Sequence, residues 1–169
     1  MLLIISFPLE AWPYFMKADK LTSRCTPSVK KIRKILVVDE ETGIINSIRL
    51  FLRSEGYKVV TAQAADYALA YLTASNPDKP ELVITDIKVP YKNGVWFIEK
   101  IRELSPTSDI LVMVNYGDRQ VLAEQIVNKT DAYIQKPFTP GQLKKTISQI
   151  IKNKKNSLSE ADMTHAKTM

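Results

Sequence analysis

Four ionisable side chains of this 169-residue chain stand at or just after the ends of short apolar runs. Asp39 and Glu40 end the first run, Asp86 ends the third, and Lys136 follows the fifth. Carboxylates that crowd together repel one another unless a cation intervenes. A hard divalent ion such as Mg²⁺ relieves this repulsion, prefers oxygen ligands and leaves a position for a phosphoryl oxygen. If the fold brings these residues together, their types indicate phosphoryl-transfer chemistry.

Each residue type has a defined task in such chemistry. A carboxylate at the end of a central strand, here Asp86, can act as a nucleophile and become an acyl phosphate. Lys136 offers a compact positive charge to another phosphoryl oxygen. Simpler interpretations stay open for each residue alone. Asp39, Glu40 and Glu41 suit the N-cap of a helix, and a Lys-Pro pair after a strand is often part of a turn.

The strands that must position these residues are predicted from five short apolar runs. The runs are rich in β-branched residues and are continuous rather than alternating, which favours parallel strands covered on both faces. They span residues 35–39, 58–61, 82–86, 110–114 and 132–134.

Apolar residues at helical spacing separate these runs and predict helices that pack on the sheet. The clearest stripes are Ile44/Ile48/Phe51/Leu52, Ala65/Ala68/Leu69/Leu72, Phe97/Ile101/Leu104 and Leu143/Ile147/Ile150/Ile151. The fourth helix in chain order, over about 118–128, has the poorest stripe. The alternation predicts an α/β fold, a (βα)₅ doubly wound sheet of five parallel strands. Such sheets carry their functional groups at the carboxyl ends of the strands.

The charge distribution predicts a folded core between two basic ends. The formal net charge is +6, of which residues 1–34 carry +5, residues 35–151 carry −1 and residues 152–169 carry +2. A nucleic-acid-binding face would place its basic residues on the folded part. We therefore expect an N-terminal extension over 1–31, one domain over 32–152, and a disordered polar tail over 153–169.

Several other classes of protein are disfavoured by composition. The apolar N-terminal run is shorter than a membrane span and is broken by Pro8, Glu10 and Pro13. A single cysteine, Cys25, excludes an internal disulfide. A single histidine, His165, argues against a histidine metal cluster or catalytic triad. No glycine-rich nucleotide-binding loop is present.

Four motifs together resemble the receiver domain of two-component response regulators. They are ILVVDEE (35–41), LVITDIKVPYKNG (82–94), VNYGD (114–118) and AYIQKPF (132–138). The combination of D-x-x-x-P-x-x-x-G with a downstream K-P-F is specific, and the resemblance covers residues 32–152. It implies a flavodoxin-like sheet with strand order 2-1-3-4-5.

The resemblance also implies a role for individual residues. Asp86 matches the phosphoacceptor, and Asp39 and Glu40 match the acidic pair that holds Mg²⁺ with it. Lys88 matches the residue whose backbone carbonyl completes the ligands of the ion. Lys136 matches the family's lysine, whose bond to the following proline is expected to be cis. Tyr133 matches the aromatic residue whose ring orientation reports the phosphorylated state.

Two positions depart from the family's pattern. Glu40 stands where an aspartate is usual, which keeps the charge and adds a methylene. Val114 stands at the switch Ser/Thr position, so the phosphorylated state lacks one charge-assisted hydrogen bond, typically about 1.5–3 kcal/mol. Asn115 offers an amide, but strand alternation should point it to the other face. We therefore expect Mg²⁺ binding and phosphorylation to persist, while coupling to the fourth helix and Tyr133 is weakened.

The resemblance implies a cytoplasmic, non-enzymatic phosphoacceptor of a phosphorelay, loaded by a histidine kinase or a phosphotransfer protein. A stand-alone receiver is expected, signalling through protein contacts, with no direct nucleic-acid contact and no stable membrane span; a homodimer stays open. The alternative is a degenerate receiver that acts as a phosphorylation-independent interaction or dimerisation module. A dehalogenase-type phosphohydrolase would need an acid at position 88, which is Lys88.

Overall fold

The computed structural model describes residues 34–74, 79–88, 94–118 and 126–165. The expected extension over 1–31 and residues 119–125 of the predicted fourth helix lie outside these described residues. The described strands are β1 (Lys34–Val38), β2 (Lys58–Ala62), β3 (Leu82–Asp86), β4 (Asp109–Val114) and β5 (Ala132–Gln135). The helices are α1 (Thr42–Ser54), α2 (Ala65–Thr73), α3 (Gly94–Leu104) and α5 (Pro140–His165), with 3₁₀ turns η3 (Tyr116–Asp118) and η5 (Val127–Lys129).

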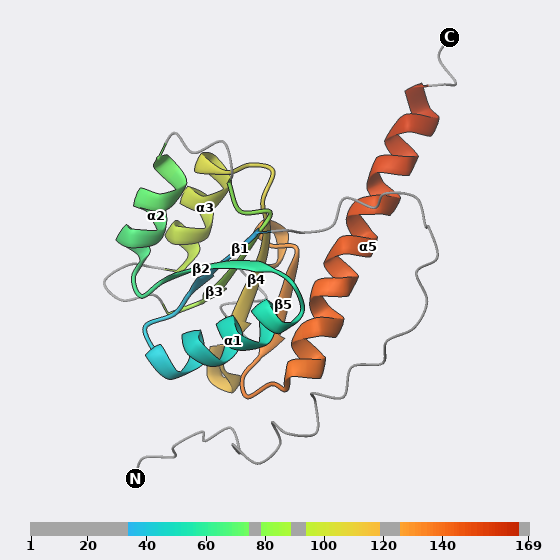
Figure 1. Cartoon of the computed structure of the whole chain (residues 1–169). Helices are drawn as coiled ribbons and strands as arrows, with labels where there is room; N and C mark the ends of the chain where they lie inside the picture. Colours follow the sequence, from blue (N-terminus) through green and yellow to red (C-terminus); the bar gives the residue numbers. More distant parts are fainter. Residues whose placement is uncertain (1–33, 75–78, 89–93, 119–125, 166–169) are drawn as a thin grey trace. The chain divides into compact units, whose positions relative to one another are not determined.

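The five strands form one parallel sheet in the order β2-β1-β3-β4-β5 (Figure 1). This confirms the predicted doubly wound fold and its strand order. Every residue of β3 and β4 is buried. Burial on both faces explains why these strands are continuously apolar instead of alternating.

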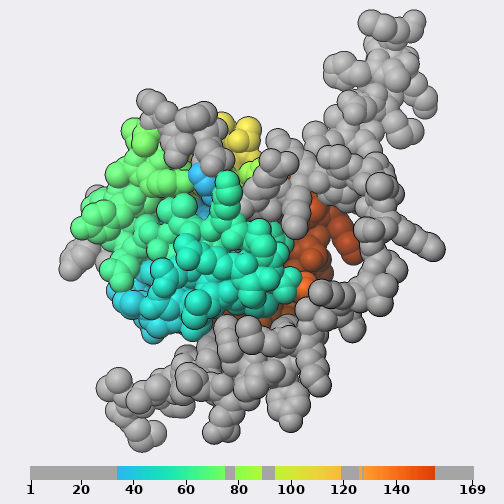
Figure 2. All heavy atoms as spheres, viewed as in Figure 1, coloured from blue at the N-terminus to red at the C-terminus, as the bar shows by residue number. Residues whose placement is uncertain are grey.

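The helices cover both faces of the sheet. Helices α2 and α3 pack on one face, and α1 and α5 pack on the other (Figure 1). The space-filling view shows the side chains of α1 covering the near side, with those of α5 beside them (Figure 2). Successive residues of a strand therefore belong to different cores: Leu36, Val38, Val112 and Val114 face α2 and α3, whereas Ile35, Val37, Leu111 and Met113 face α1 and α5.

The predicted helical stripes are confirmed with one shift. In α1 the fully buried residue of the first turn is Ile45, while Ile44 is only partly buried. The helix ends before Gly56, whose φ of +88° is accessible to glycine without strain. The Gly56 amide donates to the Arg53 carbonyl and the Tyr57 amide to the Leu52 carbonyl, which is a Schellman-type end.

The C-terminal part of the chain corrects one prediction. Helix α5 continues to His165, so the backbone over 153–165 is helical rather than a disordered tail. The polar composition suggested disorder, but this stretch contains no glycine or proline. Lys, Leu, Glu and Ala, which occur in it, all have high helix propensity. In the described residues, no helix combines the length and apolar character needed to cross a membrane.

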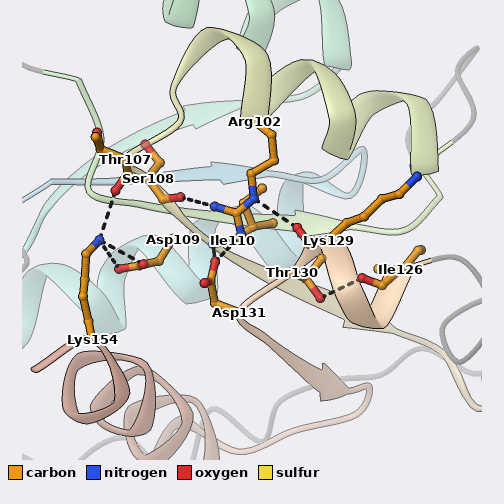
Figure 3. A network of polar contacts seen from close by, with 10 residues as sticks. All are labelled: Arg102, Thr107, Ser108, Asp109, Ile110, Ile126, Lys129, Thr130, Asp131 and Lys154. Carbon is orange, nitrogen blue, oxygen red and sulfur yellow. Dashed lines mark hydrogen bonds and ion pairs between the residues drawn. The ribbon is translucent and has the colours of Figure 1, made fainter. Parts of the chain in front are cut away.

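A polar network ties the elements together at the amino ends of β4 and β5 (Figure 3). Arg102 of α3 donates to the carbonyls of Ser108 and Lys129 and pairs with Asp131 at 2.5 Å. Lys154 of α5 binds the Asp109 carboxylate at 3.0 Å. We call these six residues the amino-edge network. It lies at the opposite edge of the sheet from the carboxyl ends that carry the predicted site.

Candidate functional site

Three of the predicted site residues meet at the carboxyl edge of the sheet. The Lys136 ammonium lies 2.8 Å from Asp39 Oδ2 and 2.5 Å from Asp86 Oδ2. All three side chains are buried. Asp39 follows β1, Asp86 ends β3 and Lys136 follows β5, so the parallel topology brings together residues up to 97 positions apart. We call this group the acid–lysine cluster.

Backbone groups hold the other oxygen of each carboxylate. The Glu41 amide donates to Asp39 Oδ1 at 2.9 Å, and the Lys88 amide donates to Asp86 Oδ1 at 2.9 Å. Helix α1 has Glu41 as its N-cap residue, without a capping hydrogen bond from its side chain. Asp39 and Glu40 therefore do not serve as the N-cap of this helix, the simpler interpretation that the sequence left open.

The two acids keep the buried lysine charged. Burial by itself lowers the pKa of Lys136, but the hydrogen bonds and charges of Asp39 and Asp86 outweigh it. The pKa of Lys136 is therefore raised above its usual 10.5. Two carboxylates and one ammonium leave the cluster with a net negative charge. Glu40, exposed beside Asp39, adds a further negative charge at its rim.

Lys136 is fixed from its backbone as well as from its side chain. Its amide donates to the Val114 carbonyl at 2.8 Å, which extends the pairing of β4 with β5 by one residue. The Lys136–Pro137 peptide bond is cis, as the sequence resemblance implied. The lysine thus projects from a backbone that is held against the end of β4.

The predicted switch positions differ in exposure. Val114 is buried and packs in the core beneath α2 and α3, and it offers no hydroxyl toward the acid–lysine cluster. Tyr133 is 57% exposed on β5. The Asn115 amide, considered as a substitute donor, binds Asp118 Oδ2 at 3.3 Å instead.

Sequence reasoning missed a second polar pair beside the cluster. Lys88 Nζ lies 3.0 Å from Asp118 Oδ1, which links the loop after β3 to the turn after β4. Burial raises the pKa of Asp118, but the bonds from Lys88 and Asn115 outweigh it and lower the pKa overall. The motif VNYGD contained Asp118, but its spacing gave no sign of a partner in another loop. We call Lys88 and Asp118 the loop pair.

The family model of the response regulator receiver domain matches residues 35–148. The chain belongs to this family. The match includes every member of the acid–lysine cluster and both residues of the loop pair.

Individual relatives support this assignment of a receiver domain. The alkaline phosphatase synthesis transcriptional regulatory protein PhoP of Bacillus subtilis is 26% identical over 133 residues, which are 78% of this chain and 53% of PhoP. Sporulation initiation phosphotransferase F of the same organism is 26% identical over 73% of this chain and 97% of its own length. A response regulator receiver domain protein from Clostridium thermocellum superposes with a TM-score of 0.66 at 29% identity, covering 73% of this chain and 97% of that structure. The chain spans about half the length of the transcriptional regulator.

The receiver's acidic residues suit a hard metal ion by their chemistry. Asp39 and Asp86 supply carboxylate oxygens at one place, and the cluster has more negative than positive charge. Oxygen donors of this kind are those that Mg²⁺ prefers. Among the described residues no three His, Cys, Asp or Glu side chains are already grouped as metal ligands. Glu40 would therefore have to turn inward to complete a set of three.

Proposed function

We propose that this receiver domain is a phosphoacceptor in a two-component phosphorelay. In this proposal Asp86 takes a phosphoryl group from a phosphohistidine on a histidine kinase or a phosphotransfer protein. The observation that carries it is the contact of Asp86 with Lys136 in a buried cluster at the carboxyl edge of the sheet. The name of sporulation initiation phosphotransferase F, which this chain covers almost completely, supports the same class of function.

The transfer step uses groups that are already in place. An oxygen of Asp86 attacks the phosphorus, an O–P bond forms, and the N–P bond to the histidine breaks. The electron pair of that bond returns to the imidazole nitrogen. Lys136, which touches Asp86 before the reaction, donates to an oxygen of the phosphoryl group as negative charge shifts onto Asp86. Its raised pKa keeps this donor charged at neutral pH.

We further propose that the receiver binds Mg²⁺ during this step. Asp39, Glu40 and Asp86 would hold it through their side chains, and Lys88 through its backbone carbonyl. When bound, the ion neutralises the carboxylates and screens the incoming phosphoryl group. The excess negative charge of the cluster supports this assignment, because Lys136 alone balances only one of the acids.

The proposal extends to output through protein contacts in the cytoplasm. The phosphorylated domain would act as a signalling module that changes what it binds, and it would not turn over a substrate. The exposed ring of Tyr133 offers one contact on the face formed by β5. A partner that recognises this face is the expected reader of the phosphorylated state.

One observation favours a second candidate function. Val114 gives the phosphoryl group no hydroxyl, which fits a degenerate receiver that binds partners or a second copy without being phosphorylated. The intact Asp39, Asp86 and Lys136 cluster supports the phosphoacceptor instead.

The test is phosphoryl uptake by the full chain. The purified protein is incubated with acetyl phosphate and Mg²⁺, and uptake is followed by intact mass and by phosphate-affinity electrophoresis. We expect uptake by the wild type and by Asp66→Asn, which alters an exposed carboxylate of α2. Asp86→Asn should show none. No labelling of the wild type would support the degenerate module, and equal labelling of Asp86→Asn would overturn Asp86 as the phosphoacceptor.

A further inference from the structure

The backbone of Lys136 lies between two anchors. On one side, its amide donates to the Val114 carbonyl at 2.8 Å, at the end of β4. On the other side, residues 137–139 link it to helix α5, which begins at Pro140. This link is short, so a displacement at the start of α5 would be passed on to Lys136. What fixes the first turn of α5 therefore bears on the position of the lysine.

The first turn of α5 carries a reciprocal capping box. Thr139 directly precedes the helix, and its carbonyl accepts the first helical hydrogen bond, from the Leu143 amide at 3.1 Å. Thr139 Oγ1 accepts a hydrogen bond from the Gln142 amide at 3.2 Å. In return, Gln142 Oε1 accepts hydrogen bonds from the Thr139 amide at 2.7 Å and from its hydroxyl at 3.1 Å. Each side chain thus satisfies a backbone amide of the other residue.

An apolar pair reinforces the same turn. Phe138 stands just before the capping residue, and Leu143 stands at the fourth position of the helix. A hydrophobic pair at these two positions fixes the angle at which the chain enters a helix. Leu143 is buried in the core between the sheet and helices α1 and α5, and Phe138 packs against the same core. Polar and apolar contacts therefore fix the chain immediately after Lys136.

The function proposed for Lys136 depends on where its backbone is held. Its ammonium contacts Asp39 at 2.8 Å and Asp86 at 2.5 Å at the same time. A lysine side chain is a flexible stem with a charge at its end. Misplacement of a stabilising group by about 1 Å can cost about a hundredfold in rate. The lysine can meet both acids and a phosphoryl oxygen only from a well-fixed starting point.

We propose that Thr139 and Gln142 are positioning residues for Lys136. Their capping box fixes the start of α5, the start of α5 fixes residues 137–138, and these hold the lysine between its two acids. Both side chains are exposed, whereas Lys136 is buried, so they act on the lysine through the backbone. The effect of this positioning on phosphoryl binding rests on the proposed phosphoacceptor function.

The test compares variants of the capping box in the full chain. Thr139→Val removes the hydroxyl and keeps the shape of the side chain, and Gln142→Ala removes the acceptor for the Thr139 amide. NMR of isotope-labelled lysine follows the Lys136 side chain, whose signals are assigned by their absence in Lys136→Met. Titration with beryllofluoride, a phosphoryl mimic, at saturating Mg²⁺ measures binding. We expect both variants to shift the Lys136 signals and to weaken binding by about three- to tenfold, less than a full displacement of the lysine would cost.

Two further variants serve as controls. The Thr146 hydroxyl also bonds within α5, to the Gln142 carbonyl at 3.0 Å, but it lies beyond the first turn. Thr146→Val should therefore leave the Lys136 signals and the affinity unchanged. Thr139→Ser keeps the hydroxyl and should retain the wild-type values. Thermal unfolding identifies the variants that are folded at the temperature of the titration, and Gln142→Ala supplies the test if Thr139→Val does not fold.

A capping box with only a structural role would give a different result. Thr139→Val and Gln142→Ala would then unfold at a lower temperature but show wild-type Lys136 signals and wild-type affinity, which would overturn the positioning role. Effects of Thr146→Val equal to those of Thr139→Val would overturn it as well. If the wild type does not bind beryllofluoride, the phosphoacceptor function fails, whereas the Lys136 signals of the unliganded variants still test the positioning role.

Discussion

Gly94, the first residue of α3, packs against the backbone carbonyl of Ile87. A Cβ on Gly94 would lie 2.0 Å from the Ile87 oxygen, well inside any permitted contact. Ile87 directly follows Asp86, and its amide donates to the Met113 carbonyl at 3.1 Å. The start of α3 therefore holds the backbone next to the proposed phosphoacceptor, and only glycine allows this approach.

Gly94→Ala should consequently destabilise the domain by about 2–3 kcal/mol, because the neighbour in the way is rigid backbone. Urea unfolding measures the change. The matched control is Gly43→Ala in α1, where an added Cβ meets nothing within 4 Å. That variant should gain about 0.4–1 kcal/mol, since alanine has less freedom to lose in the unfolded chain. Equal effects of the two substitutions would contradict the steric argument.

Lys136→Met should leave Asp39 and Asp86 buried without their shared cation. We expect a loss of roughly 3–5 kcal/mol in the free energy of unfolding at about pH 8 without Mg²⁺, as for a buried pair deprived of one partner. Added Mg²⁺ should reduce the loss if it binds the same acids.

The difference in free energy of unfolding between wild type and Lys136→Met should depend on pH, because the pKa of Lys136 is raised in the folded state. A lysine whose folded pKa exceeds the unfolded value of 10.5 contributes its full stability below 10.5 and loses it as pH rises through the folded value. The gap between the free energies of unfolding of wild type and Lys136→Met should therefore persist below pH 10.5 and shrink as the pH rises above this value. A gap that does not change with pH would argue against the charge-based explanation.

Val114→Thr should enlarge the structural response to beryllofluoride and Mg²⁺. The new hydroxyl adds a donor for the phosphoryl mimic, and the shifts of Asn115 and Tyr133 amides should grow relative to wild type. The control is Val112→Thr, the same change two residues earlier on the same buried face of β4. Val112→Thr should lower the free energy of unfolding by a similar amount, about 1–3 kcal/mol, without enlarging the amide shifts on addition of beryllofluoride. Equal responses in both variants would refute the prediction.

Asp109 of the amino-edge network gives a second pH test. Burial raises its pKa above the usual 3.8, although the bond from Lys154 opposes this (Figure 3). An acid with a raised folded pKa loses its contribution to stability as pH rises from the unfolded value through the folded one. The free energy of unfolding of Asp109→Asn relative to wild type should thus improve as the pH rises through and above 3.8. Lys154→Met should reduce the free energy of unfolding most at the higher pH, where Asp109 is ionised and needs its partner. Denaturant unfolding measures this loss.

Most of the fold was accessible from hydrophobic periodicity because both faces of the sheet are covered. Each described strand starts and ends within one residue of its predicted run; β3, for example, is Leu82–Asp86 in both. The prediction of a disordered C-terminal tail was wrong because this segment has no hydrophobic periodicity. Residues 153–165 lack an apolar stripe, and composition alone could not separate a helix from a disordered tail.

Some residues of the candidate site could be predicted from the sequence and others could not. Asp39, Asp86 and Lys136 were predictable because parallel strands present their carboxyl ends at one edge. The loop pair was not, since the contact of Lys88 with Asp118 depends on two loop conformations that no sequence period encodes.

The amino-edge network has a practical consequence for engineering. Asp109 and Val114 begin and end the same six-residue strand, so about 16 Å separates them. Substitutions that far apart and without shared partners usually combine additively. The free energy of unfolding can therefore be adjusted at Arg102, Asp109 or Lys154 without altering the proposed phosphoacceptor site at the other end of β4.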